Sequence, residues 1–108
     1  MEEIVQERRF NVRWYLHLSH PQGGMFRGRT FYVSSTGLLF FAPVRYRVGD
    51  TFDMEIFIES VRSIRCTVKI VADGSPYSAE FLRFSGDDHK LLNDTLLALH
   101  RKNVTKRK

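Results

Sequence analysis

Cysteine and lysine are scarce in this chain, and it has no long hydrophobic run. Cys66 is the one cysteine among 108 residues, which excludes an intramolecular disulfide and a cluster of thiolate metal ligands. No apolar stretch approaches the roughly 20 residues that a membrane-spanning helix needs. The chain starts Met1-Glu2-Glu3, without the basic-then-apolar order of a secretory signal. These absences favour a soluble, cytoplasmic protein with no membrane span.

The composition predicts one folded domain. A length of 108 residues is enough for one small domain with a core. Hydrophobic residues make up 43% of the chain and aromatic residues 13%, including nine Phe. We therefore expect a packed fold rather than disorder.

The net charge of +5 is concentrated at the C-terminus. The last eight residues hold five of the 17 basic groups and no acid, which leaves 12 basic and 12 acidic residues in positions 1–100. Ten of those 12 basic residues are arginines, and half of the arginines lie among the first 29 residues. The charge pattern predicts a flexible N-terminal arm at 1–11 that carries the first arginines, a folded domain at 12–101 and a frayed basic tail at 102–108.

Six segments have the pattern of short β-strands. Apolar and polar residues alternate in most of them, so that one face is suited to a core. In the second segment we expect Arg29, Phe31 and Val33 to share a face. The expected strands cover residues 12–18, 27–33, 38–41, 51–58, 64–70 and 77–84. Because closure removes exposed sheet edges, six short strands with frequent turns predict an all-β, six-stranded antiparallel barrel.

The hydrophobic period changes after the last expected strand. Ser85 stands three residues before Asp88, which is typical of a helix N-cap. Leu92, Leu96 and Leu99 follow at helical spacing. They predict a C-terminal amphipathic α-helix of about four turns, with the leucines packed on the barrel.

No set of residues is suited to catalysis or to metal binding. His17 and His20 are three apart, but no carboxylate or thiolate is nearby in sequence. Cys66 is on the apolar side of an alternating strand, as a small core residue would be. No nucleophile, base and orienting group occur in a recognisable arrangement. We expect a protein that is not an enzyme and has no catalytic residue, metal site or cofactor.

Two short motifs are informative. Arg9 and Arg13 lie four apart where the expected arm meets the first strand, and Arg8 directly precedes them. An arginine can hold a phosphate through two hydrogen bonds and can stack on a base. Ser34-Ser35-Thr36-Gly37 is a turn between two apolar runs, and its small residues allow close approach to a flat ligand. Together the motifs favour a bound anionic nucleotide.

These motifs resemble those of the PilZ domain family, in the same order and at similar spacing over essentially the whole domain. The family pattern is Arg-x-x-x-Arg followed by Asp/Asn-x-Ser-x-x-Gly. The resemblance implies a PilZ-like barrel with a C-terminal helix, which acts as a receptor for the bacterial messenger cyclic di-GMP. It implies that Arg9 and Arg13 bind the phosphates and guanines of the ligand. Ser34 and Gly37 would form the turn around one guanine, and an arginine at the position of Arg8 is associated with a stacked pair of ligands.

Two residues depart from the family pattern. Tyr32 stands where the family has Asp or Asn, and a tyrosine cannot accept two hydrogen bonds from a base edge. Ser78 stands where many relatives have Gly, and its side chain could crowd a base. The expected ligand-binding residues are Arg8, Arg9, Arg13, Tyr32, Ser34 and Gly37.

Two other functions remain open from the sequence. A degenerate PilZ domain that binds no nucleotide would act as a protein-interaction adaptor in motility, pilus or polysaccharide control. The cyclic di-GMP receptor implied above would act in the same kind of process, by changing conformation to regulate an unidentified protein partner. A third possibility is single-stranded nucleic acid, which would stack on exposed aromatics. Its candidate residues are Tyr15, Phe26, Tyr32 and Tyr46, but the neutral charge of residues 1–100 argues against it.

Overall fold

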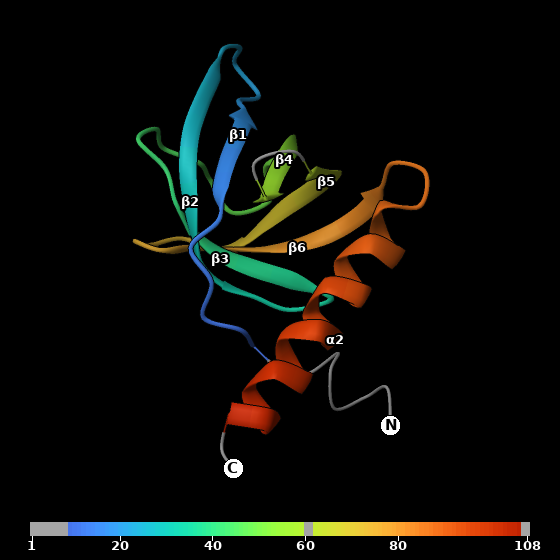
Figure 1. Ribbon diagram of the computed structural model, residues 1–108. Coiled ribbons are helices and arrows are strands. Elements are labelled where there is room, and N and C mark those ends of the chain that lie inside the picture. The colour runs from blue at the N-terminus through green and yellow to red at the C-terminus, as the bar shows by residue number, and fades with distance from the viewer. Residues whose placement is uncertain (1–8, 60–61, 107–108) are drawn as a thin grey trace.

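Six antiparallel strands close into a barrel, and one helix lies against it (Figure 1). The computed structural model describes residues 9–59 and 62–106. The strand order around the barrel is β1-β2-β3-β6-β5-β4, so that β4 closes the sheet by pairing with β1. The predicted fold class is confirmed. The elements are β1 (Tyr15–Ser19), β2 (Met25–Val33), β3 (Gly37–Phe41), β4 (Thr51–Glu59), β5 (Arg62–Ala72), β6 (Tyr77–Phe84) and α2 (Asp88–Lys106).

Alternating side chains from all six strands fill the barrel. Phe40, Tyr46, Phe52 and Tyr77 form an aromatic cluster in this core. Tyr46 stacks on Phe52, with ring centroids 4.2 Å apart, and donates its hydroxyl hydrogen to the Ser19 carbonyl at 2.8 Å. Aromatic burial of this kind supplies much of the apolar area that holds a small domain together.

The β2–β3 pairing contains an extra residue that the sequence did not reveal. The register shifts between Thr30 and Tyr32, which leaves Phe31 without a partner on β3. Thr30 and Val33 are both buried, whereas Arg29 is exposed. The prediction that Val33 shares a face with Arg29 and Phe31 is therefore wrong, because a bulge reverses the two-residue alternation.

The chain joins the barrel before the first strand begins. Phe10 is buried, its N–H donates to the Val33 carbonyl at 2.8 Å, and its carbonyl accepts from the Val33 N–H at 2.9 Å. The Thr30 hydroxyl donates to the Val12 carbonyl at 2.5 Å and accepts from the Trp14 N–H at 2.8 Å. Phe10 therefore does not belong to a flexible arm, while residues 1–8 of the expected arm lie outside the described part of the chain.

The helix begins later than the sequence suggested. The Asp87 carbonyl accepts the first helical hydrogen bond, from the Leu91 N–H at 3.1 Å, so Ser85 is not the N-cap. The Asp88 carboxylate instead accepts from the Arg65 N–H of β5 at 2.8 Å. This bond fixes the start of α2 on the barrel. Residue spacing near the helix could not predict it, because its donor lies on β5.

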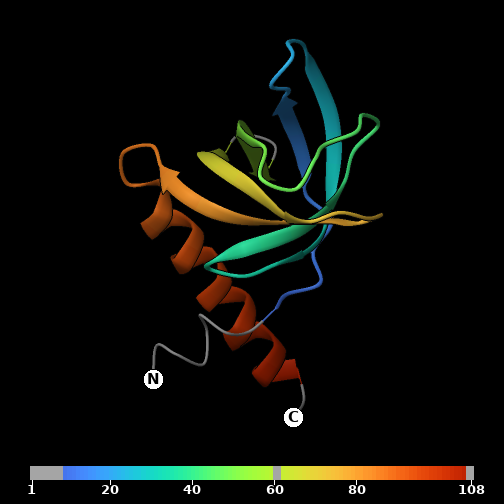
Figure 2. The same ribbon diagram turned by 180° about the vertical axis from the view of Figure 1, so that it is seen from behind.

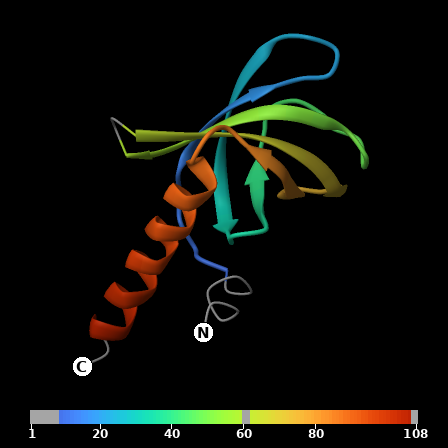
Figure 3. The same cartoon turned by 90° about the vertical axis from the view of Figure 1, so that its right-hand side faces the viewer.

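The first half of α2 packs on the barrel and the second half runs away from it (Figures 2 and 3). Leu92 and Leu96 are fully buried and Leu99 is partly buried, which confirms the predicted packing of the stripe. The helix has 19 residues and continues to Lys106, so that most of the expected tail at 102–108 is helical. Lysine and arginine are good helix formers, and cations are favourable at a helix C-terminus. No helix in the described ranges combines the length and hydrophobicity required to cross a membrane.

Candidate functional site

The side chains with the most perturbed acidities belong to the core. Burial raises the pKa of Cys66 to about 12, and burial also raises the pKa of Tyr46. Both side chains are packed inside the barrel, so these shifts reflect desolvation rather than a reactive site. Because Tyr46 is buried, it cannot offer a stacking surface to a nucleic acid. Among residues 9–59 and 62–106, no group of three or more His, Cys, Asp or Glu could hold a metal ion.

A groove of about 480 Å³ runs along the β2–β3 turn and β6. Four of the six residues expected to bind a ligand line it, namely Arg9, Tyr32, Ser34 and Gly37. A volume of a few hundred Å³ is typical of a small-molecule site. The groove therefore brings together two motifs that are about twenty residues apart in the sequence.

Ser34 organises the turn through its own hydroxyl group. Its Oγ accepts from the N–H groups of Thr36 and Gly37, each at 3.2 Å. The Ser34 N–H donates to the Gly37 carbonyl at 2.9 Å and closes the hairpin. Because the Ser34 hydroxyl already bonds within the turn, its main effect is to fix the shape of the groove wall.

Gly37 is required by the packing of two strands. A Cβ placed on it would collide with the carbonyl oxygen of Ala79 on β6 and would lie 3.3 Å from the Cα of Glu80. Its φ is not in the left-handed region, so the requirement is one of space. Gly37 allows β3 and β6 to approach closely, a structural role that the sequence did not reveal.

Tyr32 and Glu80 give the groove its side-chain chemistry. Tyr32 is half-buried, and its ring packs against Phe31 with centroids 4.7 Å apart. Glu80 is exposed, lines the groove, and is the cross-strand partner of Gly37. Sequence reasoning missed Glu80 because the pairing of β3 with β6 joins segments more than 35 residues apart. Ser78, which the sequence had singled out, is half-buried and also lines the groove.

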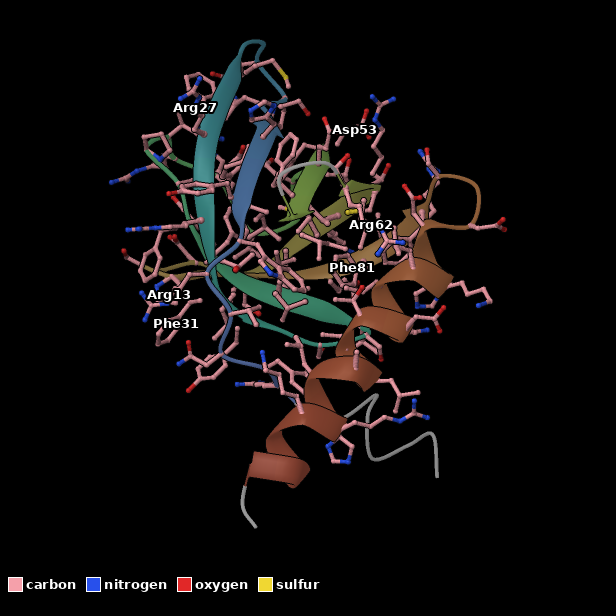
Figure 4. All side chains as sticks on the ribbon, in the orientation of Figure 1. Arg13, Arg27, Phe31, Asp53, Arg62 and Phe81 are labelled. Atoms are coloured by element: carbon pink, nitrogen blue, oxygen red, sulfur yellow. The ribbon has the colours of Figure 1, made fainter. Side chains whose placement is uncertain are left out.

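The predicted arginines occupy different positions. Arg9 is exposed at the groove, one residue before the anchored Phe10. Arg13 is exposed on the outer surface, with its guanidinium carbon 5.5 Å from the centroid of the Phe31 ring (Figure 4). Arg13 does not line the groove in this structure, and Arg8 lies outside the described residues. The pair thus does not form a closed clamp here.

The arrangement can hold a flat, anionic ligand of nucleotide size. Arg9 supplies a fixed positive charge, Tyr32 supplies an aromatic ring, and Glu80 supplies two hydrogen-bond acceptors. The turn at Ser34–Gly37 supplies a rigid wall. These groups are suited to binding and orienting a ligand, and they include no nucleophile paired with a base.

The fold is shared with solved structures, of which two are described here. The chain is similar to the Bacillus subtilis inhibitor of motility, MotI/DgrA, at 15% identity and a TM-score of 0.73, covering 96% of this chain and 55% of that one. This chain thus spans about half of the length of MotI/DgrA. It is also similar to the PilZ domain of YcgR from Escherichia coli, solved with c-di-GMP, at 16% identity and a TM-score of 0.71. That match covers 94% of this chain and 98% of the YcgR domain.

The family is established by the sequence profile. No curated protein matches the chain. The PilZ domain profile, in contrast, matches residues 5–98, a range that includes both motifs, all six strands and the buried half of α2. The chain therefore belongs to the PilZ domain family, whose members are regulatory ligand-binding domains.

Proposed function

We propose that this domain is a receptor for cyclic di-GMP, which it binds in the groove of the β2–β3 turn. The observation that carries the proposal is the convergence of Arg9 with Tyr32, Ser34 and Gly37 on one groove. The PilZ domain of YcgR, which shares the fold, was solved with c-di-GMP. Binding would change the conformation near the arginines and so regulate a protein partner in motility, pilus or polysaccharide control. Because this messenger is made inside bacterial cells, the proposal places the domain in the cytoplasm.

Arg9 is the proposed phosphate ligand. Its guanidinium group can give two parallel hydrogen bonds to one phosphate, and it stays charged at any physiological pH. Phe10 is held by two backbone hydrogen bonds to Val33, so Arg9 is tethered beside the turn. A hydrogen bond to a charged group contributes about 1.5–3 kcal/mol.

Tyr32 and Glu80 are the proposed guanine ligands. The Tyr32 ring, held against Phe31, offers a face on which a base can stack, worth about 1–3 kcal/mol per base. A guanine edge presents N1–H and N2–H donors, which match the two oxygens of a carboxylate. Glu80 thus replaces the Asp or Asn that the family has at the position of Tyr32.

Arg13 requires a small rearrangement to join the site. Its stacking on Phe31 is a surface cation–π contact, which is worth about 0.5–1 kcal/mol. A charge-assisted hydrogen bond to phosphate contributes more than this. It is therefore favourable for Arg13 to leave the Phe31 ring and bind the phosphate. Arg8, if it reaches the ligand, would add a second charge next to Arg9.

Titration calorimetry with cyclic di-GMP tests the proposal. Arg9→Ala and Arg13→Ala should each weaken binding at least about tenfold. Tyr32→Ala and Glu80→Gln should do the same, whereas Tyr32→Phe should bind like the wild type because it keeps the ring. Arg83→Ala is the matched control, since Arg83 is exposed on β6 and does not line the groove. If no heat and no NMR shift change appear at about 1 mM ligand, the receptor proposal fails and the adaptor function replaces it.

A further inference from the structure

A continuous row of aromatic and arginine side chains crosses the outside of the barrel. Tyr15 of β1 pairs with Phe57 of β4 on one side and with Arg29 of β2 on the other. Arg29 in turn pairs with Phe41 of β3. Because cross-strand partners point to the same face, these four side chains lie side by side across four strands.

Two further arginines border this row. Arg27 pairs with His17 on the same outer face, and Arg13 lies over Phe31 next to Phe41. Figure 4 shows Arg13, Arg27 and Phe31 on the side of the barrel away from α2. We call this surface the β1–β2 face and define it by Arg13, Tyr15, Arg27, Arg29, Phe41 and Phe57.

The β1–β2 face is exposed and hollowed. Tyr15 is 68% exposed, and Met25, at the end of the same face, is 67% exposed. A shallow groove of about 760 Å³ runs over it, with Arg13, Trp14, Arg27 and Phe57 in its lining. Among the aromatic residues that line the groove, Tyr15 is exposed, and Trp14 and Phe57 are half-buried. Apolar side chains gathered around a groove, rather than scattered singly, mark an interaction site.

The positive charge on this face is not balanced by the described part of the chain. Glu55, across from His17 on β4, accepts from the Ser63 hydroxyl at 2.5 Å and pairs with Arg65 at 3.7 Å. A second ion pair joins Lys90 to Asp94 on α2, on the other side of the barrel from this face. Among the side chains that the structure describes, in residues 9–58 and 62–102, Arg13, Arg27 and Arg29 have no carboxylate partner.

The composition of the face fits a protein partner better than a nucleic acid. Protein interfaces are enriched in tyrosine, tryptophan, phenylalanine, methionine and arginine and are depleted in lysine, which is the composition found here. A nucleic-acid track needs a strong net positive charge, whereas residues 1–100 are formally neutral. The closed barrel offers no free edge between β1 and β2, so a partner docks on side chains and does not add a strand.

We propose that the β1–β2 face docks an acidic, aromatic- or leucine-containing segment of a partner protein. Carboxylates of the segment pair with Arg27 and Arg29, and its apolar side chains cover Tyr15 and Phe57. The proposal does not depend on nucleotide binding, because these four residues lie outside the groove of the β2–β3 turn.

Fluorescence anisotropy with labelled peptides tests this surface. The probe is a 12-residue peptide with three repeats of Asp-Glu-Leu-Phe, compared with a peptide in which lysine replaces both acids and with a 12-residue poly-glutamate. The acidic apolar peptide should bind saturably, and the double variant Arg27→Glu/Arg29→Glu should weaken it at least about tenfold. Lys69→Glu/Arg83→Glu is the matched control, since both residues are exposed on β5 and β6 and the change in charge is the same.

The apolar contribution has its own pair of variants. Tyr15→Ser should weaken the peptide, whereas Leu82→Ser, on β6 and 47% exposed, should leave it unchanged. Thermal unfolding of all variants confirms that each is folded. The proposal is overturned if the Asp-Glu-Leu-Phe peptide does not bind, if poly-glutamate binds equally well, or if a 12-nucleotide oligothymidylate binds more tightly. Concentration-dependent sedimentation that Tyr15→Ser abolishes would also overturn it, because the face would then join two copies of this chain.

Discussion

Replacing Gly37 by alanine tests whether this glycine serves the barrel or the ligand. The added Cβ would overlap the Ala79 carbonyl oxygen and would lie 3.3 Å from the Glu80 Cα, and both obstacles are backbone atoms of β6. Backbone cannot rotate aside as a long side chain can, so β3 and β6 must separate. We expect Gly37→Ala to destabilise the domain even when no ligand is present.

The size of the effect follows from overpacking and chain entropy. Forcing an extra carbon into a packed site costs about 1–3 kcal/mol, and a backbone obstacle places Gly37→Ala at the upper end. The lower entropy of the unfolded alanine chain returns about 0.5 kcal/mol. The net loss of about 2–2.5 kcal/mol corresponds to a Tm lowered by about 8–10 °C for a domain of this size.

Gly49→Ala is the matched control. Gly49 has a φ of +97°, and a Cβ added to it would have no atom within 4 Å, so alanine there meets backbone strain without a collision. That strain costs about 1–2 kcal/mol before the same entropy term is applied. Urea and thermal unfolding of both variants, without ligand, give the comparison. The reasoning is refuted if Gly37→Ala loses no more stability than Gly49→Ala.

Two further predictions concern the core. Thr30→Val keeps the side-chain shape but leaves the Val12 carbonyl and the Trp14 N–H without their partner, so urea unfolding should show a loss of about 2–3 kcal/mol. A loss below about 0.5 kcal/mol would mean that this hydroxyl does not hold the Val12–Trp14 segment. Burial keeps the pKa of folded Cys66 at about 12, above its ordinary 9.0, so the unfolded thiol loses its proton first as the pH rises. Its contribution to stability should be complete below pH 9 and fall by about 1.4 kcal/mol per pH unit above that, and Cys66→Ala should flatten this decline; an unchanged slope would contradict it.

The sequence predicts best the strands that have one face buried in the core and the other face exposed to solvent. In β4 and β5 the buried residues alternate with polar ones, because one side of each strand faces the core and the other faces water. The predicted alternation fails at Phe31, because a bulge adds one residue to β2. The order of apolar and polar residues in the sequence does not reveal this bulge. The sequence also does not predict the burial of Phe10, which is the one apolar residue between Glu7 and Asn11. Its burial depends on pairing with Val33.

The candidate site was predictable where it is local and not where it depends on strand pairing. The turn at Ser34–Gly37 is a short-range structure, and its hydroxyl and glycine indicate it directly. The presence of Glu80 in the groove depends on which strand lies beside β3, and no local pattern encodes that neighbour. Arg9 and Arg13 are equivalent in sequence, but the anchoring of Phe10 and the ring of Phe31 direct them to different surfaces.

The anchoring of Phe10 also determines how much order a ligand must impose. Phe10 is bonded in both directions to Val33, which directly precedes Ser34 in the groove wall. Arg9 is the residue directly before Phe10, so its backbone lies close to this fixed point. The Arg9 guanidinium therefore samples a volume set by the length of one side chain. Its effective concentration at the groove is high, in the millimolar range or above that is typical of short tethers. In the proposed complex, engagement of Arg9 would cost mainly its own rotamer entropy, about 2 kcal/mol, and not that of a whole loop. The strength of the proposed contact would consequently be set by the barrel and not by the length of chain that precedes it.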